Sequence, residues 1–172
     1  MVRKREGGCR SFLLSRAAAF TLLLVAGSVS LFGISVTVSG GAGFSIGAAD
    51  LIDGAGSDFA SDYSSADDSI LVSVAETTGD GDGWQIQVRR EDVLWHGSLD
   101  LAVLRTGGGS GTGSVTGGDV LPLDLSSVDQ VFFEGSGDRA GIPIRMDLGG
   151  VSVLIPLDSY SATLVFTVVD IP

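Results

Sequence analysis

The chain has 172 residues, and its 10 Lys and Arg against 21 Asp and Glu give a formal net charge of -11. The imbalance is greater beyond residue 40, where twenty acidic residues face five arginines and no lysine. A surface of this charge repels nucleic acid, because binding a duplex requires Lys and Arg to displace counterions from the phosphates. Composition therefore argues against a nucleic-acid partner and favours a soluble domain with a single core.

The first forty residues have the pattern of an export signal. Five basic residues precede Ala17, an uncharged apolar run covers residues 17–27, and small residues follow. The segments Ala26-Gly27-Ser28 and Gly40-Gly41-Ala42 both fit a cleavage site. An uncleaved membrane anchor is the alternative, because no charge occurs between residues 17 and 49.

This pattern divides the chain in two. We predict a signal peptide or hydrophobic helix over residues 1–40, which engages the membrane and the export machinery, and a secreted surface domain over residues 41–172. The only cysteine, Cys9, lies in the leader, so the exported domain would contain no disulfide and no thiolate metal site. A domain of this size buries enough apolar surface to fold without either.

Most of the secreted region alternates apolar and polar residues with the period of two that is typical of half-buried strands. The clearest case follows the turn of residues 79–83, where Trp84, Ile86 and Val88 share one face. Weaker or similar alternation occurs over residues 34–38, 44–51, 69–74, 99–104, 120–125, 142–148 and 160–169. About eight to ten short strands separated by Gly-rich turns predict an all-β fold, an antiparallel β-sandwich with Trp84 and Phe166 in its core.

Three segments carry more specific predictions. The Gly149-Gly150 pair, between two alternating arms, predicts a hairpin over residues 142–155 with a two-residue turn. Residues 106–118 contain mostly Gly, Ser and Thr, which predicts a flexible loop and lacks the spacing of a phosphate-binding loop. Residues 160–169 are apolar on both faces, which indicates a central strand or one that a partner covers.

Two short motifs give the chain a likeness to a known family. Gly83-Trp84-Gln85-Ile86-Gln87-Val88 follows a Gly/Asp turn, and Phe166-Thr167-Val168 precedes Asp170-Ile171-Pro172 near the end of the chain. Over roughly residues 44–172 this arrangement resembles a WxL-type bacterial cell-surface domain, with Ile86 in place of Leu and Phe166 in place of Trp. The resemblance implies a β-sandwich that attaches non-covalently to a cell-wall polymer, with Trp84, Ile86, Phe166 and Val168 as the wall-binding residues. The alternative role for these four side chains is the hydrophobic core.

A second function class is an extracellular fibre or pilus subunit, which borrows a strand from a neighbouring copy. Residues 34–38 are the candidate for the lent strand. Residues 44–51, Phe-Ser-Ile-Gly-Ala-Ala-Asp-Leu, also resemble the early segment of camelysin-type biofilm fibre subunits. In this case the partners are copies of the chain itself.

Catalysis and cofactor binding find little support in the sequence. His96 is the only histidine, and no G-x-S-x-G elbow accompanies it. Asp80 and Asp82 alternate with glycines in a manner that suits calcium, but the strand at Trp84 begins where further ligands of a calcium loop would lie. A plain turn is the simpler interpretation. We therefore expect a non-enzymatic protein without a cofactor or a small-molecule substrate.

Overall fold

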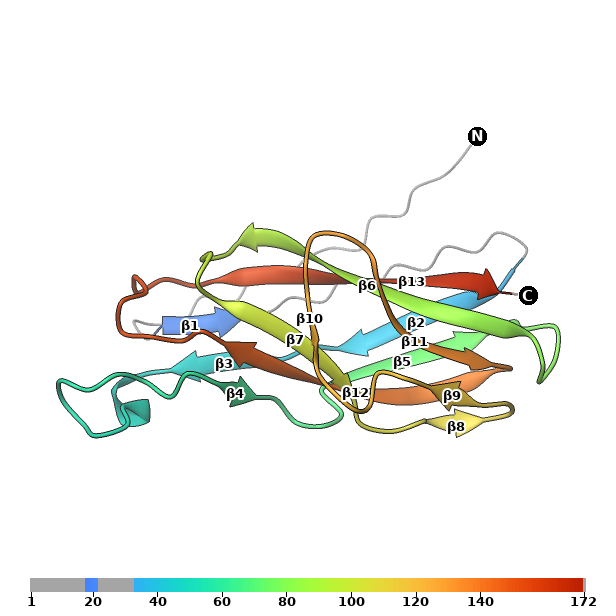
Figure 1. Ribbon diagram of the computed structural model, residues 1–172, viewed down its shortest axis with the longest axis horizontal. Coiled ribbons are helices and arrows are strands. Elements are labelled where there is room, and N and C mark those ends of the chain that lie inside the picture. The colour runs from blue at the N-terminus through green and yellow to red at the C-terminus, as the bar shows by residue number, and fades with distance from the viewer. Residues whose placement is uncertain (1–17, 22–32, 172) are drawn as a thin grey trace.

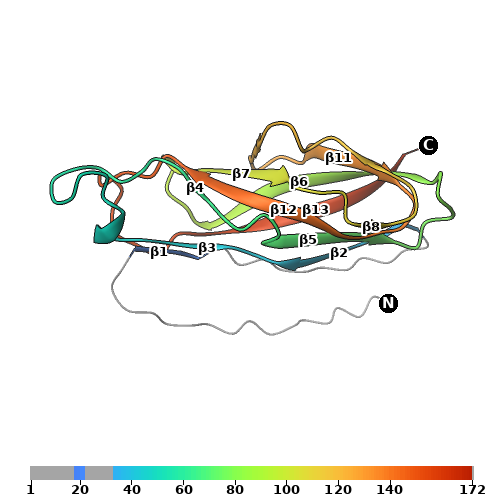
Figure 2. The same cartoon turned by 90° about the horizontal axis from the view of Figure 1, so that it is seen from below.

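The computed structural model describes residues 18–21 and 33–171, and these residues form an all-β protein with two main antiparallel sheets. The seven-stranded sheet has the order β10-β7-β12-β5-β2, and β4 and β8 also pair with β12; the four-stranded sheet has the order β13-β6-β11-β9. Figures 1 and 2 show the two sheets as layers along the length of the molecule. The strands are β1 (Ala18–Thr21), β2 (Ser35–Gly40), β3 (Gly43–Ile46), β4 (Tyr63–Ser64), β5 (Ile70–Ala75), β6 (Gly83–Leu94), β7 (Asp100–Arg105), β8 (Ser110–Gly111), β9 (Val115–Thr116), β10 (Leu123–Asp124), β11 (Gln130–Ser136), β12 (Arg139–Gly149) and β13 (Ser161–Ile171).

The expected all-β architecture is confirmed, whereas the expected N-terminal helix is not supported. Ala18–Thr21, inside the apolar run of the leader, forms strand β1 and pairs with β3 as a separate two-stranded sheet. The helical content of the described residues is one short 3-10 turn, η1 (Ala48–Asp50). Residues 1–17 and 22–32 of the leader, with the cleavage site expected at residues 26–28, lie outside the described residues. The last residues of the predicted leader, Ser35–Gly40, form strand β2 of the seven-stranded sheet.

Strand β6 is the centre of the four-stranded sheet, as the alternation around Trp84 predicts. It pairs with β11 on one side and with β13 on the other. Trp84, Ile86 and Val88 are all 0% exposed. The indole Nε1 of Trp84 donates a buried 2.8 Å hydrogen bond to the Gly137 carbonyl, and the ring packs edge-on against Phe133. The indole N–H of Trp84, a buried donor, thus has a hydrogen-bond acceptor.

The main hydrophobic core lies between the two sheets. Trp84 and Ile86 from the four-stranded sheet pack in one cluster with Val72 and Ile144 from the seven-stranded sheet, and Phe166 borders the same cluster. A second, smaller cluster at one end of the sandwich is built from Ile46, Leu99, Leu148, Val151, Ile155 and Tyr160. The half-buried Phe44 packs against both clusters, so β3 joins the two parts of the core.

The predicted hairpin over residues 142–155 is wrong in its second arm. β12 forms as expected, but the chain after Gly150 is irregular until β13, and Leu154 is 88% exposed. The reason is that β12 lies inside its sheet: Leu148 pairs with Leu101 on one side and with Tyr63 on the other. No edge remains for a returning strand.

The glycine-rich segment of residues 106–118 is ordered, contrary to the predicted flexible loop. Its β8 and β9 pair with β12 and β11. Two arginines bind its backbone: Arg139 donates hydrogen bonds to the carbonyls of Gly108, Gly109 and Gly111, and the buried Arg105 donates to Gly117 and Gly107. Guanidinium groups thereby replace the side-chain packing that glycine cannot supply.

Candidate functional site

The four residues expected to contact a cell-wall polymer fall into two pairs. Trp84 and Ile86 are fully buried in the main core, so in this fold they have no surface to offer a ligand. Phe166 and Val168 face the same core from β13 and are only half-buried. The register brings the two motifs together, because Phe166 lies opposite Val88 and Val168 opposite Ile86. Burial thus favours the core role for the first pair and leaves exposed surface only on the second.

Strand β13 occupies an edge of its sheet, where the sequence predicts either a central or a partner-covered strand. Its described strand partner is β6 alone, along Ser161–Ile171. Val165 and Val169 on the outward face of β13 are half-buried, as are Phe166 and Val168 on its inward face. A long apolar edge strand of this kind is a template for pairing with another strand.

The two ends of each sheet differ in a consistent way. One edge of the seven-stranded sheet is the two-residue strand β10, and one edge of the four-stranded sheet is the two-residue strand β9. Such short edge strands expose few backbone N–H and C=O groups to which another strand could pair. The predicted strand at residues 120–125 shrinks to β10, and Val120 and Leu121 are solvent-exposed. The other edges are the longer β2 and β13, which contact each other. We call the side of the sandwich formed by β2, β3 and β13 the open flank.

Strand β1 lies on the open flank, between β3 and the beginning of β13 (Figures 1 and 2). It pairs antiparallel with β3, with Ala18 opposite Ile46 and Thr21 opposite Gly43, and it also contacts β13. Among the described residues β1 is the only strand that pairs with β3. The position of β1, between the edge of β3 and the edge of β13, therefore has room for one strand. We call this position the slot.

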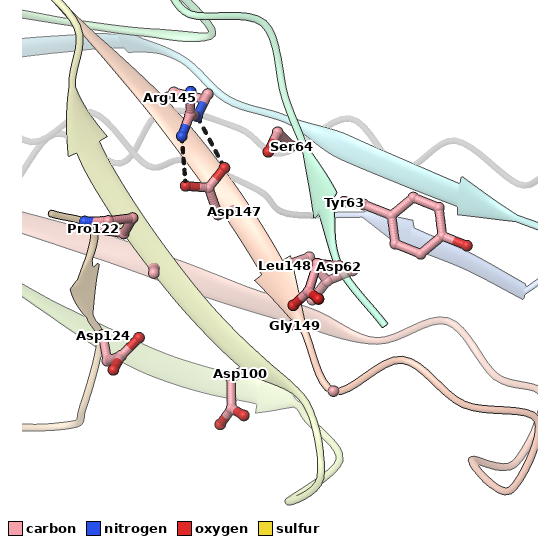
Figure 3. Close-up of a pocket in the computed structure, with 12 residues that line it drawn as sticks. Asp62, Tyr63, Ser64, Asp100, Pro122, Asp124, Arg145, Asp147, Leu148 and Gly149 are labelled. Atoms are coloured by element: carbon pink, nitrogen blue, oxygen red, sulfur yellow. Dashed lines mark hydrogen bonds and ion pairs between the residues drawn. The ribbon is translucent and has the colours of Figure 1, made fainter. Parts of the chain in front are cut away.

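A polar hollow of about 350 Å³ lies on the seven-stranded sheet (Figure 3). The ends of β4, β7, β10 and β12 bring its carboxylates together: Asp62, Asp100, Asp124 and Asp147. Asp147 accepts hydrogen bonds from Arg145, with a Nε–Oδ1 distance of 2.9 Å, so the one cation lining the hollow is neutralised. The sequence gives no signal for this site, because its acidic residues are scattered through an acidic chain.

The carboxylates that line the hollow accept hydrogen bonds, which suits hydroxyl or ammonium groups of a ligand. Ligand pockets are usually lined mainly by apolar and aromatic groups, but the Tyr63 ring points away from this one (Figure 3) and packs in the second cluster. Burial, and then the nearby Asp50 carboxylate, raise the pKa of the Tyr63 phenol. No group of three or more His, Cys, Asp or Glu within residues 18–21 and 33–171 is placed to hold a metal ion.

The other sequence candidates are engaged in local structure. The Asp82 carboxylate accepts a 2.6 Å hydrogen bond from the Thr78 amide, which closes the turn before β6. The His96 Nδ1 accepts a hydrogen bond from the Ser98 amide, and its ring packs edge-on against Tyr160. These contacts support a turn at residues 78–82 and a structural His96.

The five arginines beyond residue 40 are all held by intramolecular contacts. Arg89 pairs with Glu91 and Asp129, and Arg90 pairs with Asp92 and lies 4.7 Å from the centre of the Trp95 ring. Arg105 pairs with Asp119, and Arg145 and Arg139 have the partners described above. Of the twenty acidic residues in this region, six form ion pairs with arginine in the described structure, so the surface presents mainly unpaired carboxylates.

Comparisons with known proteins do not extend this description. No family model, curated protein or solved structure matches the chain. No helix in the described part of the chain is long and apolar enough to cross a membrane.

Proposed function

We propose that this chain is an exported, non-enzymatic structural protein of the bacterial cell surface, whose β-sandwich associates with the envelope. The observation that carries the proposal is the distribution of charge. Five of the ten basic residues precede the apolar run of the leader, and the five beyond residue 40 are all engaged within the fold. An acidic exterior behind a basic, apolar leader suits a protein that is translocated and stays soluble outside the cell.

The geometry of the described residues supports a binding or structural role over catalysis. The hollow in Figure 3 is lined by carboxylates, a paired arginine and the Ser64 hydroxyl, and its lining residues include no histidine or cysteine. If the WxL resemblance extends to wall binding, the contact belongs to Phe166 and Val168, which keep exposed surface on the open flank. Their apolar faces would pack against a wall polymer, while Trp84 and Ile86 support them from the core.

Cell fractionation and sedimentation test this function. The chain expressed with its own leader should appear in the envelope and medium fractions, and the purified domain should sediment with peptidoglycan. Phe166→Ala should weaken sedimentation, whereas Val131→Ala, on an exposed residue of β11, should leave it unchanged. Retention of the intact chain in the cytoplasm would contradict export, and equal sedimentation of both variants would remove Phe166 from the contact.

A second candidate function is a subunit of an extracellular fibre assembled by strand donation. The open flank favours it, because β2 and β13 are long uncapped edges while the opposite edges are two-residue strands. The expected lent strand, residues 34–38, falls largely within β2, which pairs with β5 of the same chain along its whole length. A fibre subunit should polymerise when purified, and a wall-binding monomer should not.

A further inference from the structure

The leader contributes a strand to the folded domain that export would remove. β1 (Ala18–Thr21) belongs to the apolar run of the leader, whereas the two main sheets are built entirely from residues 35–171. Loss of residues 1–27 therefore leaves both main sheets complete and empties the slot between β3 and β13. Cleavage at residues 40–42 would remove β2 as well, so we place it upstream of Ser35.

An empty slot leaves both backbone and apolar groups exposed. β3 would lose the only strand that pairs with it in the described structure, so its outward N–H and C=O groups would have no ladder partner. Phe44 on β3 and Phe166 on β13 are already half-buried and border the main core. An open apolar edge is a site for adding a strand.

The charge of the slot selects an uncharged strand. β3 carries no charge, and the only charged residue of β13 is Asp170, at the end remote from β1 (Figure 1). The rest of the domain is strongly acidic. Residues 28–34, which precede β2, are likewise uncharged and include Val29, Leu31 and Phe32. They would form the new N-terminus after cleavage at residues 26–28.

These residues are too short to fill the slot of their own chain. β2 begins at the end of the molecule opposite β1, and β2 and β3 run almost in line (Figures 1 and 2). Seven extended residues reach at most about 25 Å, and they would have to reverse direction and then pass the whole of β2 before lying along β3. After cleavage at residues 26–28 the same segment is the start of the chain, so it is available to the slot of another copy.

We infer that the leader strand β1 closes an acceptor slot between β3 and β13, and that leader removal opens this slot to residues 28–34 of a second copy. This inference rests on the fibre function proposed above and adds its acceptor site and its control by processing. Each copy would give one strand and receive one at the opposite end, which generates an open head-to-tail chain. The unprocessed protein could not assemble, because its own leader occupies the slot.

The test compares three purified forms by sedimentation velocity and electron microscopy. The form 28–172 should polymerise, while 1–172, with its slot filled, and 35–172, without a donor, should remain monomers. A fluorescent peptide of residues 28–34 should bind 35–172 and not 1–172. Circular dichroism should show that both 28–172 and 35–172 are folded β proteins, since both retain the two main sheets.

A matched pair of donor variants separates the inference from the function on which it rests. Leu31→Asp in the peptide should weaken binding to 35–172 by about tenfold or more, because a charge would enter an apolar slot. Ser30→Asp places the charge on the other face of the strand, so this peptide should bind nearly as well as the native peptide. If 28–172 polymerises but both variants bind equally, or if the peptide binds 1–172 as well as 35–172, the slot inference fails and the fibre function stands. If 28–172 stays monomeric, both fail.

Discussion

Replacement of Trp84 by phenylalanine tests whether the fold is organised around this side chain. Trp84 is fully buried at the start of β6, donates to the Gly137 carbonyl at 2.8 Å and packs edge-on against Phe133, with the ring centres 6.2 Å apart. A phenyl ring retains the aromatic contact with Phe133. It loses the hydrogen-bond donor and three heavy atoms of the indole.

The two losses can be estimated separately. Leaving the buried Gly137 carbonyl without its donor costs about 1–3 kcal/mol, and the smaller ring leaves a cavity that costs about 1–2 kcal/mol, below the full aromatic-to-alanine range. We expect the free energy of unfolding to fall by about 2–5 kcal/mol, against about 5–15 kcal/mol for a typical domain. The same change at Trp95 is the matched control, because that half-buried indole also donates to a carbonyl, at 2.9 Å to Leu99.

Urea denaturation followed by far-UV circular dichroism measures both effects on the full chain. With a slope of about 1–3 kcal/mol/M, Trp84→Phe should lower the midpoint by about 0.7 M or more. Trp95→Phe should cost less than about 1.5 kcal/mol, because water can reach its site and replace part of the lost hydrogen bond. A midpoint shift at Trp84 no larger than the shift at Trp95 would refute the central role of the Trp84 indole.

Three further predictions concern the parts that support this core. Gly135→Ala should destabilise the fold by about 1–3 kcal/mol, since the new Cβ would lie 2.5 Å from Trp84 Cζ2 and 2.6 Å from the Ser114 carbonyl oxygen. Gly47→Ala is the control, because Gly47 has open space around it, and it should have little effect in the same urea titration. Equal effects of the two variants would contradict the packing argument. Arg139→Lys keeps the charge but loses the planar guanidinium that donates to several carbonyls of residues 106–118. Limited proteolysis should therefore cleave this segment faster in Arg139→Lys than in the control Arg89→Lys, because the partners of Arg89 are exposed carboxylates. Similar cleavage rates in the two variants would show that Arg139 does not hold the segment. Hydrogen bonds from the Val153 and Phe59 amides and the Ser152 hydroxyl lower the pKa of Asp58, and those from the Thr77 hydroxyl and amide lower the pKa of Asp138. The stabilisation from these two carboxylates is therefore present above the ordinary pKa of 3.8 and is lost as the pH falls through the lower pKa values of the folded state. The melting temperature of Asp138→Asn should be lower than that of the native chain at pH 7, and the two melting temperatures should converge at low pH. A difference in melting temperature that grows in acid would contradict the argument.

Local alternation was enough to predict the strands that face the core. The period of two at Trp84, Ile86 and Val88 reflects a strand with one buried face, and the same pattern correctly predicts the inward residues of β5 and β12. The Gly-Gly pair after Leu148 failed as a hairpin signal because pairing depends on which edges are free. That property belongs to the assembled sheet and leaves no mark on the two residues.

The features of the open flank and the glycine-rich segment also depend on distant parts of the chain. Composition predicts a flexible loop at residues 106–118, and only the fold brings the Arg139 guanidinium to its carbonyls. The apolar character of both faces of β13 was visible in the sequence, but whether it marks a central or an edge strand was not. The strand formed by Ala18–Thr21 could not be predicted, because a short apolar run in a leader has the same pattern in a signal helix.

The most direct test of the proposed export and processing is the intact mass of the protein recovered from outside the cell. We predict a mature N-terminus between residues 22 and 34, a chain that has lost β1 and kept all of β2. A secreted chain that begins at residue 41 or 42, or a protein found only inside the cell with residue 1 intact, would contradict the account.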